Sequence, residues 1–374
     1  MDTPLRGAVV NFHSVASKQD RLQYLIHCLK LDYLIGTESW LNPQITDNEA
    51  FSPDITEKFE AFRNDRRGKF GMNEGGGVFI LVSKRFRSWR CENLYDKFAD
   101  KAEMLWCNIE MKANEPPCYV GAFYRPEHTD SAYLDFLNEA LIIIDSSRLS
   151  PLVLLGGDFN LPDVDWAENV FLTNGRYSQC SNTMIDIATQ HGLVQTVDAP
   201  TRVQGTTQNT LDLLFTNRPA NINKVEVMPS IEASDHYPVF VEASASPLVV
   251  VKPPRYVPQY KRVDWAEYKK DARKISNDVL EAAAQGKDAS SLWETFMNGL
   301  KSASKKHIPQ KLVKDRHGLP WISTDVKRLM RKRDKARHKW QKSRNTNNML
   351  HNEDLFNRYK DLKCKSQSAM RRAY

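Results

Sequence analysis

The stretch that most constrains the fold is an apolar run at residues 151–155, which ends in two glycines and then in Asp158, Phe159 and Asn160. An unbroken apolar run that ends at glycine predicts a strand covered on both faces. Because side chains alternate along a strand, Asp158 and Asn160 are expected on one face while Phe159 points into the core. The two glycines lack a Cβ, so a backbone or a ligand can approach closely there. The stretch therefore predicts an acid and an amide in one cavity.

Similar apolar runs recur along the first two thirds of the chain, several of them separated by amphipathic segments. Leu22, Leu25, Ile26 and Leu29 have helical spacing, and helices are also expected at 131–147 and near 181–191. Alternation of strands with helices, together with several neighbouring strands, predicts an α/β domain built as a four-layer α/β/β/α sandwich of two mixed sheets. The expected strands are 7–15, 32–41, 77–83, 89–95, 103–111, 117–124, 151–156, 210–216, 222–228 and 238–243.

The length and a change in composition predict more than one unit. The chain has 374 residues, of which 41% are hydrophobic, so it can build a large core. We expect the α/β domain at 1–245 and a proline-rich linker at 246–262. A mostly helical basic connector at 263–374 follows, with helices near 264–284, 289–304, 323–343 and 352–373.

Charge is unevenly distributed. Residues 311–374 contain 19 Lys and Arg against 6 Asp and Glu, whereas residues 1–310 contain 34 against 40. The basic tail is interpreted either as a solvated helical face or as a nucleic-acid-binding segment, for RNA as well as DNA. Near an acidic site, local cations matter more than net charge because salt screens over about 8 Å. Candidates for phosphate contacts in the body are Arg63, Arg66, Arg67, Arg125 and Arg202.

Targeting signals and cysteine patterns bear on the compartment. The sequence has no apolar stretch long enough to span a bilayer, and its first residues lack a signal-peptide pattern. The six cysteines form no CxxC pair and no zinc spacing, which is typical of reduced thiols. We expect a nuclear or cytoplasmic protein that is neither secreted nor in a membrane. The oligomeric state stays open.

Polar residues follow the apolar runs at several expected strand ends, and such ends often meet at one edge of an α/β sheet. They are Asn11, Glu38, Asp158 with Asn160, and the pair Asp235-His236. Carboxylates and amides without a cysteine suit a hard cation such as Mg²⁺ or Mn²⁺. A hard cation beside a histidine and a tyrosine favours phosphate ester chemistry.

Six motifs occur in a fixed order: NFHS, TESWL, FYRP, GGDFN, NTLDLLFTN and SDHYPV. This set resembles the endonuclease/exonuclease/phosphatase superfamily, and within it the apurinic-type endonuclease domain of LINE-type (non-LTR) retrotransposons. The resemblance extends over about residues 7–243. The basic tail resembles the connector that precedes the reverse transcriptase in such polyproteins, and no polymerase palm motif follows it here. We therefore expect a partial reading frame without its reverse transcriptase domain.

The resemblance implies a metal-binding group and a catalytic group. Glu38 resembles the principal metal ligand, with Asn11 beside it and Asp235 as an accessory carboxylate. In the catalytic group, Asp158 resembles the residue that orients or deprotonates the attacking water, and His236 the catalytic histidine. Asn160 and Tyr124 resemble the phosphate-binding residues, and Asp212 the acid that orients the histidine. Either Asp158 or His236 could be the general base.

The resemblance implies a DNA nicking endonuclease whose 3′-hydroxyl product can prime reverse transcription. Two alternatives stay open. One is a phosphatase or phosphodiesterase of the same superfamily, and the other is an inactive fragment that binds nucleic acid through residues 311–374. His13 stands where many relatives carry a different residue, which leaves its contact with DNA open. No segment matches the loops that confer specificity for abasic sites.

Overall fold

The protein is described by a computed structural model. It describes residues 4–66, 75–112, 115–146, 150–166, 170–171, 178–205, 207–230, 234–250, 256–312, 323–343 and 349–373. By its contacts the chain divides into two compact units. The first holds the chain up to Val250 together with the segment from Gly318 onward, and the second holds the segment from Val251 to His317.

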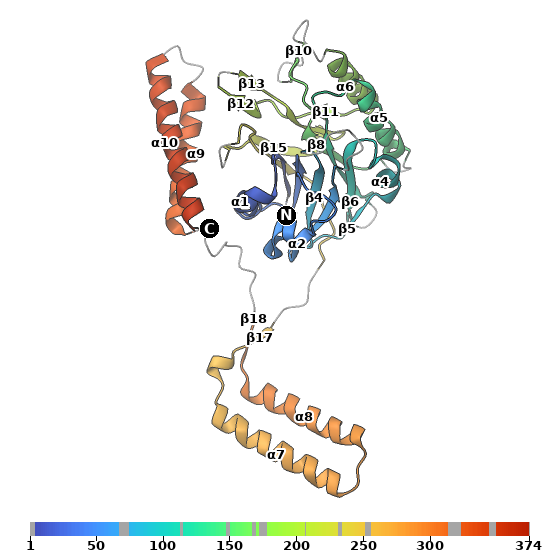
Figure 1. Ribbon diagram of the computed structural model, residues 1–374, viewed down its shortest axis with the longest axis vertical. Helices are drawn as coiled ribbons and strands as arrows, with labels where there is room; N and C mark the ends of the chain where they lie inside the picture. Colours follow the sequence, from blue (N-terminus) through green and yellow to red (C-terminus); the bar gives the residue numbers. More distant parts are fainter. Residues whose placement is uncertain are drawn as a thin grey trace. The chain divides into compact units, whose positions relative to one another are not determined.

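Two six-stranded mixed sheets form the centre of the first unit (Figure 1). The first has the order β15 (Ile222–Val227), β16 (Val239–Ala243), β1 (Leu5–Asn11), β2 (Tyr33–Thr37), β4 (Val78–Ser83) and β3 (Phe59–Asn64). The second has the order β11 (Val194–Gln195), β14 (Asp212–Thr216), β8 (Val153–Asp158), β7 (Cys118–Tyr124), β6 (Glu103–Ile109) and β5 (Ser88–Arg90). β1 and β2 are parallel, as are β7 and β8, while the other pairs are antiparallel.

Helices cover the outer face of each sheet. α1 (Gln19–Leu29), α2 (Asp47–Phe51) and α3 (Pro53–Thr56) share an apolar cluster with the first sheet. α4 (Glu92–Phe98), α5 (Ala132–Asp145) and α6 (Ser178–Gln190) do so with the second. A third cluster, which includes Val9, Ile35, Val120 and Leu154, lies between the two sheets. The expected four-layer α/β/β/α architecture is confirmed.

One expected strand is wrong in its second half. The segment 89–95 was expected to be a strand, but β5 ends at Arg90 and the chain continues as α4. Leu94 and Phe98 are four residues apart and both buried, so this segment buries an apolar helical face against the second sheet. β3 was not expected, because its sequence FEAFRN lacks a clear alternation and has a partly exposed centre.

The helical C-terminal region is present, in two pairs of helices. α7 (Trp265–Ala284) and α8 (Ala289–His307) form the second unit with the short strands β17 (Tyr256–Pro258) and β18 (Gln310–Leu312). α9 (Thr324–Ser343) and α10 (Met349–Ala373) belong to the first unit, with the sheets. The domain limits at 245 and 262 remain predictions. Within the described ranges, no helix combines the length and apolar character needed to cross a membrane.

Candidate active site

The candidate site lies where the strand ends of both sheets meet. In the first sheet, Asn11 is the last residue of β1, it pairs with Thr37 at the end of β2, and Glu38 follows directly. In the second sheet, Tyr124 and Asp158 end the parallel strands β7 and β8 and are paired with each other. Parallel strands finish at the same sheet edge, so these side chains reach one cleft.

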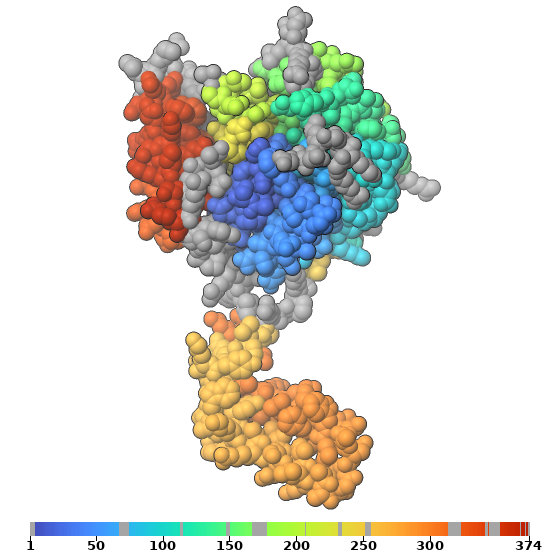
Figure 2. All heavy atoms as spheres, viewed as in Figure 1, coloured from blue at the N-terminus to red at the C-terminus, as the bar shows by residue number. Residues whose placement is uncertain are grey.

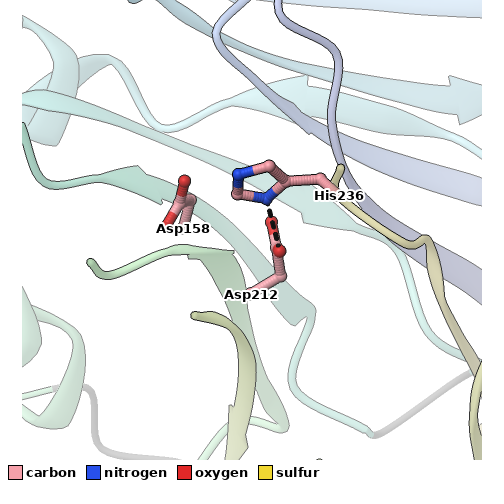
Figure 3. A group of neighbouring side chains, drawn as sticks. All are labelled: Asp158, Asp212 and His236. Carbon is pink, nitrogen blue, oxygen red and sulfur yellow. Dashed lines mark hydrogen bonds and ion pairs between the residues drawn. The ribbon is translucent and has the colours of Figure 1, made fainter. Parts of the chain in front are cut away.

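Asp212 and His236 reach the site from segments that belong to, or directly precede, antiparallel strands. Asp212 begins β14 and lies opposite Asp158 in the register of β14 and β8. His236 precedes β16, and its Nδ1 donates a hydrogen bond to Oδ2 of Asp212 at 2.8 Å. Figure 3 shows this bond, with the carboxylate of Asp158 beside the imidazole ring. Asp158, Asp212 and His236 are all buried.

Asn11 joins the two sheets across the site. Its Nδ2 donates to Oε1 of Glu38 and to Oδ2 of Asp158, both at 2.9 Å, while its Oδ1 accepts from the backbone N–H of His13. The other carboxylate oxygen of Asp158 accepts from the backbone N–H of Asn160 at 3.1 Å. The amide therefore holds two carboxylates in fixed positions, one from each sheet.

Several non-glycine residues in the site have left-handed backbone conformations. Glu38 and Asn160 both have φ of 48°, Trp40 has φ of 56° and His13 has φ of 44°. Such conformations are unfavourable for L-residues and concentrate at functional sites, where the surrounding structure maintains them. The Trp40 ring lies 4.4 Å from the His13 ring, and His13 Nδ1 lies 3.1 Å from Oε2 of Glu38.

The surroundings of Asp158 and His236 raise the pKa of both side chains. Burial, and then the nearby Asp212 carboxylate, raise the pKa of Asp158 to about 7. Burial opposes the cationic form of His236, but the Asp212 carboxylate outweighs it and raises the pKa of the imidazole to about 9. His236 is therefore a cation at neutral pH in this arrangement, held by Asp212 in one orientation.

The cleft has a volume of about 590 Å³, large enough for a small ligand or a segment of a polymer. The residues expected from the sequence that line it include Glu38, Tyr124, Asp158, Asn160, Asp235 and His236. Asn160 Nδ2 donates to the carbonyl of Arg125 at 2.8 Å, which orients the amide. Asp235 accepts from Nε of Arg202 at 2.9 Å, and this ion pair keeps the pKa of Asp235 low although burial acts in the opposite direction.

The arginines expected to face phosphates have protein partners. Arg66 donates to Oε1 of Glu103 through Nε at 3.0 Å and Nη2 at 2.7 Å. Arg63 pairs with Asp47 and Asp65, and Arg202 pairs with Glu127 and Asp235.

Arg125 does not face the solvent. Its side chain is fully buried and donates to the carbonyls of Phe159, Asn160 and Thr129. The expectation of a phosphate contact is therefore wrong for Arg125, whose side chain instead fixes the turn after β8. Arg67 lies outside the described residues.

The donor set fits a hard divalent cation. Carboxylate oxygens of Asp158 and Asp212 lie within 4.8 Å of each other and of His236, which is protonated and bonded to Asp212 and so is not itself a ligand. Oδ1 of Asp212 is buried and has no hydrogen-bond partner among the described residues. Glu38 contributes a further carboxylate, joined to Asp158 through Asn11. Buried carboxylates this close are stabilised by a cation, and oxygen donors suit Mg²⁺ or Mn²⁺.

Glu103 was missed by the sequence reasoning. It is buried and lies at the start of β6, where it pairs with Arg66 and accepts from the backbone N–H of Gly77. It also pairs with Tyr124 in the register of β6 and β7, so it supports the floor of the cleft. Its position at the start of an apolar strand was the available signal, but one acid at a strand end is too common to be distinctive.

Comparisons with known proteins agree with this geometry. Residues 118–240 match a family described as "Endonuclease-reverse transcriptase". The AP endonuclease LMAP from Leishmania major is 12% identical, with a TM-score of 0.51 over 64% of this chain and 88% of that one. The endonuclease domain of TRAS1, a telomere-specific non-LTR retrotransposon, is 14% identical, with a TM-score of 0.49 over 65% of this chain and 99% of that one. No protein with a curated description matches the chain significantly.

The two-sheet sandwich carries carboxylates, an amide and a histidine together at one edge. Over residues 118–240 the chain is similar to the endonuclease–reverse transcriptase family, and its two-sheet fold is shared with the Leishmania AP endonuclease.

Proposed function

We propose that the chain is a DNA nicking endonuclease of a non-LTR retrotransposon that depends on Mg²⁺ or Mn²⁺. The observation that carries the proposal is the meeting of Asp158, Asp212 and His236 beside the Asn11–Glu38 pair. The six ordered motifs and the match to an endonuclease–reverse transcriptase family support the retrotransposon assignment. A nuclear or cytoplasmic location is part of the same proposal.

In the proposed reaction, Glu38 and Asn11 hold the divalent cation, with Asp235 as an accessory carboxylate at the rim. When bound, the cation supplies charge neutralisation at the phosphate and lowers the pKa of water. Asn160 and Tyr124, which both line the cleft, hold the scissile phosphate by hydrogen bonds. The substrate is a DNA strand, and the product carries a 3′-hydroxyl.

His236 and Asp158 have different roles in this proposal. Because Nδ1 of His236 is bonded to Asp212, Nε2 is the nitrogen that can donate to a phosphate oxygen. Asp158 is held by Asn11 and by the backbone of Asn160, and it orients the attacking water and accepts its proton. The hydrogen bonds that each side chain makes support this division of roles.

The test is nicking of a supercoiled plasmid in the presence of Mg²⁺. The wild-type chain is expected to nick, and Glu38→Ala and His236→Ala are expected not to. Glu115→Ala, which lies before β7 and so at the opposite end of that strand from the site, is the matched control. Extension of the nicked plasmid by a DNA polymerase, without prior phosphatase treatment, reports a 3′-hydroxyl. Equal nicking by wild type and both site variants would refute the proposal.

The same assay separates the two alternatives. A phosphatase or phosphodiesterase would hydrolyse small phosphate esters and leave the plasmid intact. An inactive fragment would bind DNA and cleave neither substrate at any metal concentration.

A further inference from the structure

The helical hairpin of α9 and α10 packs on the same unit as the cleft. Val326 and Met330 of α9 and Met370 of α10 belong to the apolar cluster that contains Tyr24 and Leu25 of α1. In Figure 1 the hairpin, in orange and red, lies alongside α1, and Figure 2 shows the same two helices as one continuous surface. The hairpin is therefore anchored to the body through a packed apolar contact.

A second set of contacts joins the hairpin to the segment that carries the catalytic histidine. Arg337 is buried, and its Nη1 donates to the carbonyl of Val227 at 2.7 Å. The guanidinium of Arg337 lies 5.6 Å from the ring centre of Tyr237, and Nζ of Lys363 lies 6.0 Å from it. Tyr237 directly follows His236, so the hairpin contacts the residue next to a side chain that lines the cleft.

The outer face of α9 is entirely basic. Beyond Asp325, every exposed side chain of α9 that the structure describes is basic, and this basic face consists of Lys327, Arg328, Arg331, Lys332, Lys335, His338 and Lys339. Many of these are four residues apart, where like charges repel and destabilise a helix. A face built for solvation alone usually alternates acids and bases, so this pattern favours an external polyanion.

The distribution of charge in the first unit also favours a polyanion as the partner of the basic face. Residues 1–250 contain 22 Lys and Arg against 33 Asp and Glu, whereas residues 324–373 contain 16 against 5. Near the cleft, Arg66 and Arg202 are bonded to carboxylates and Arg125 to backbone carbonyls. These three arginines already have protein partners, and α9 offers further cations from another part of the unit.

We propose that the basic face of α9 binds the phosphodiester backbone of the nucleic acid whose scissile phosphate enters the cleft. That this partner is the nucleic acid cut in the cleft rests on the proposed function. Successive positions such as Lys327, Arg331 and Lys335 are about 6 Å apart along the helix axis. Nucleotides rise about 3.4 Å along one strand, so each step spans about two phosphates. The contacts are to the backbone, and they bind DNA and RNA alike.

The test compares two variants with the same change in charge. The hairpin variant carries Lys327→Gln, Arg331→Gln, Lys335→Gln and Lys339→Gln, since glutamine keeps a good helix propensity. The matched control carries Lys269→Gln, Lys274→Gln, Lys287→Gln and Lys301→Gln, all exposed and all in the second unit. Circular dichroism establishes that both are folded. Fluorescence anisotropy in EDTA then measures the affinity of each full-length chain for duplex DNA and single-stranded RNA across a salt series.

The hairpin variant is expected to bind at least about tenfold more weakly at physiological salt. Its plot of log affinity against log salt is expected to be shallower by about one unit for each lost phosphate contact. The control is expected to keep the wild-type affinity and slope. Weaker binding of both nucleic acids supports the proposal, whereas weaker binding of RNA alone, with DNA bound as tightly as by the wild type, would overturn it.

Equal behaviour of the two variants would overturn the inference. So would loss of binding to phosphatidylserine vesicles with unchanged binding to nucleic acid, which would assign the basic face to a membrane. Hydrolysis of bis(p-nitrophenyl) phosphate separates this inference from the proposed function, because that substrate is too small to reach α9. Wild-type hydrolysis by the hairpin variant with weakened DNA binding supports the inference. Weakened binding in a chain that cleaves nothing also supports it, while the nuclease proposal fails.

Discussion

Asp158 and Asp212 lie directly opposite each other in the antiparallel register of β8 and β14, and their carboxylates have different partners. Asp212 accepts from Nδ1 of His236 at 2.8 Å, whereas Asp158 accepts from Nδ2 of Asn11 at 2.9 Å. The two acids are therefore equivalent in strand position and distinct in chemistry, since one orients an imidazole and the other faces the cleft.

The first prediction concerns this orientation. Asp212→Asn keeps the shape of the side chain and removes the charge that holds His236 in one tautomer. We expect kcat for plasmid nicking to fall by about 10²- to 10⁴-fold with KM little changed. Asp186→Asn, at an exposed position on α6, is the control and is expected to keep full activity. If the activity of the variant fell only in proportion to the fraction of its chains that is unfolded, the assigned role would be contradicted.

The second prediction concerns the pH dependence of stability without metal. The pKa of His236 is raised from 6.5 to about 9 in the fold, so its stabilising contribution is complete below about pH 6.5 and is lost as the pH rises through 9. The raised pKa of Asp158, about 7, changes the free energy of unfolding in the same direction. In EDTA, urea unfolding is expected to give a lower free energy of unfolding at pH 9 than at pH 6.5.

The decrease attributable to His236 is at most about 3 kcal/mol. His236→Gln is expected to show a smaller decrease over the same interval. If the variant and the wild type lost the same free energy between these two pH values, the raised pKa of the imidazole would be wrong.

The third prediction concerns the cation. Glu38→Gln keeps a hydrogen-bonding group beside Asn11 but removes the carboxylate charge. We expect the affinity for Mn²⁺, measured by electron paramagnetic resonance, to fall by about ten- to a hundredfold. Glu115→Gln, before the start of β7, is expected to bind as the wild type does. Unchanged binding in Glu38→Gln would place the cation elsewhere.

The fourth prediction concerns the approach of two strands below the site. Gly157 has φ of 153°, and a Cβ built there would overlap the carbonyl oxygen of Phe123 on β7. Gly157→Ala is expected to lower the free energy of unfolding by more than about 3 kcal/mol. Gly192 also has a positive φ, of 59°, but a Cβ built there meets no atom within 4 Å. Gly192→Ala is therefore expected to lower the free energy of unfolding by only about 1 kcal/mol. Thermal or urea unfolding measures both, and equal costs would contradict the steric explanation.

The sequence by itself determined most of the strands of the two sheets, the layered architecture and the positions at which polar residues leave the sheets. Those features are local, because an apolar run and the alternation of side chains specify a strand and its two faces within a few residues. The residues at the ends of β1 and β8 and directly after β2 could be chosen in this way, and the structure brings Asn11, Glu38 and Asp158 together. The roles assigned to them stay predictions.

Only the tertiary structure decided which partner each charged side chain has. Arg66 pairs with Glu103, Arg125 turns inward to backbone carbonyls, and α9 packs against α1. These contacts join segments that are distant along the chain, and their free energy depends on burial and on competing partners. Neither quantity exists until the two sheets have packed, because the low dielectric of the packed interior is what makes an unpaired charge costly.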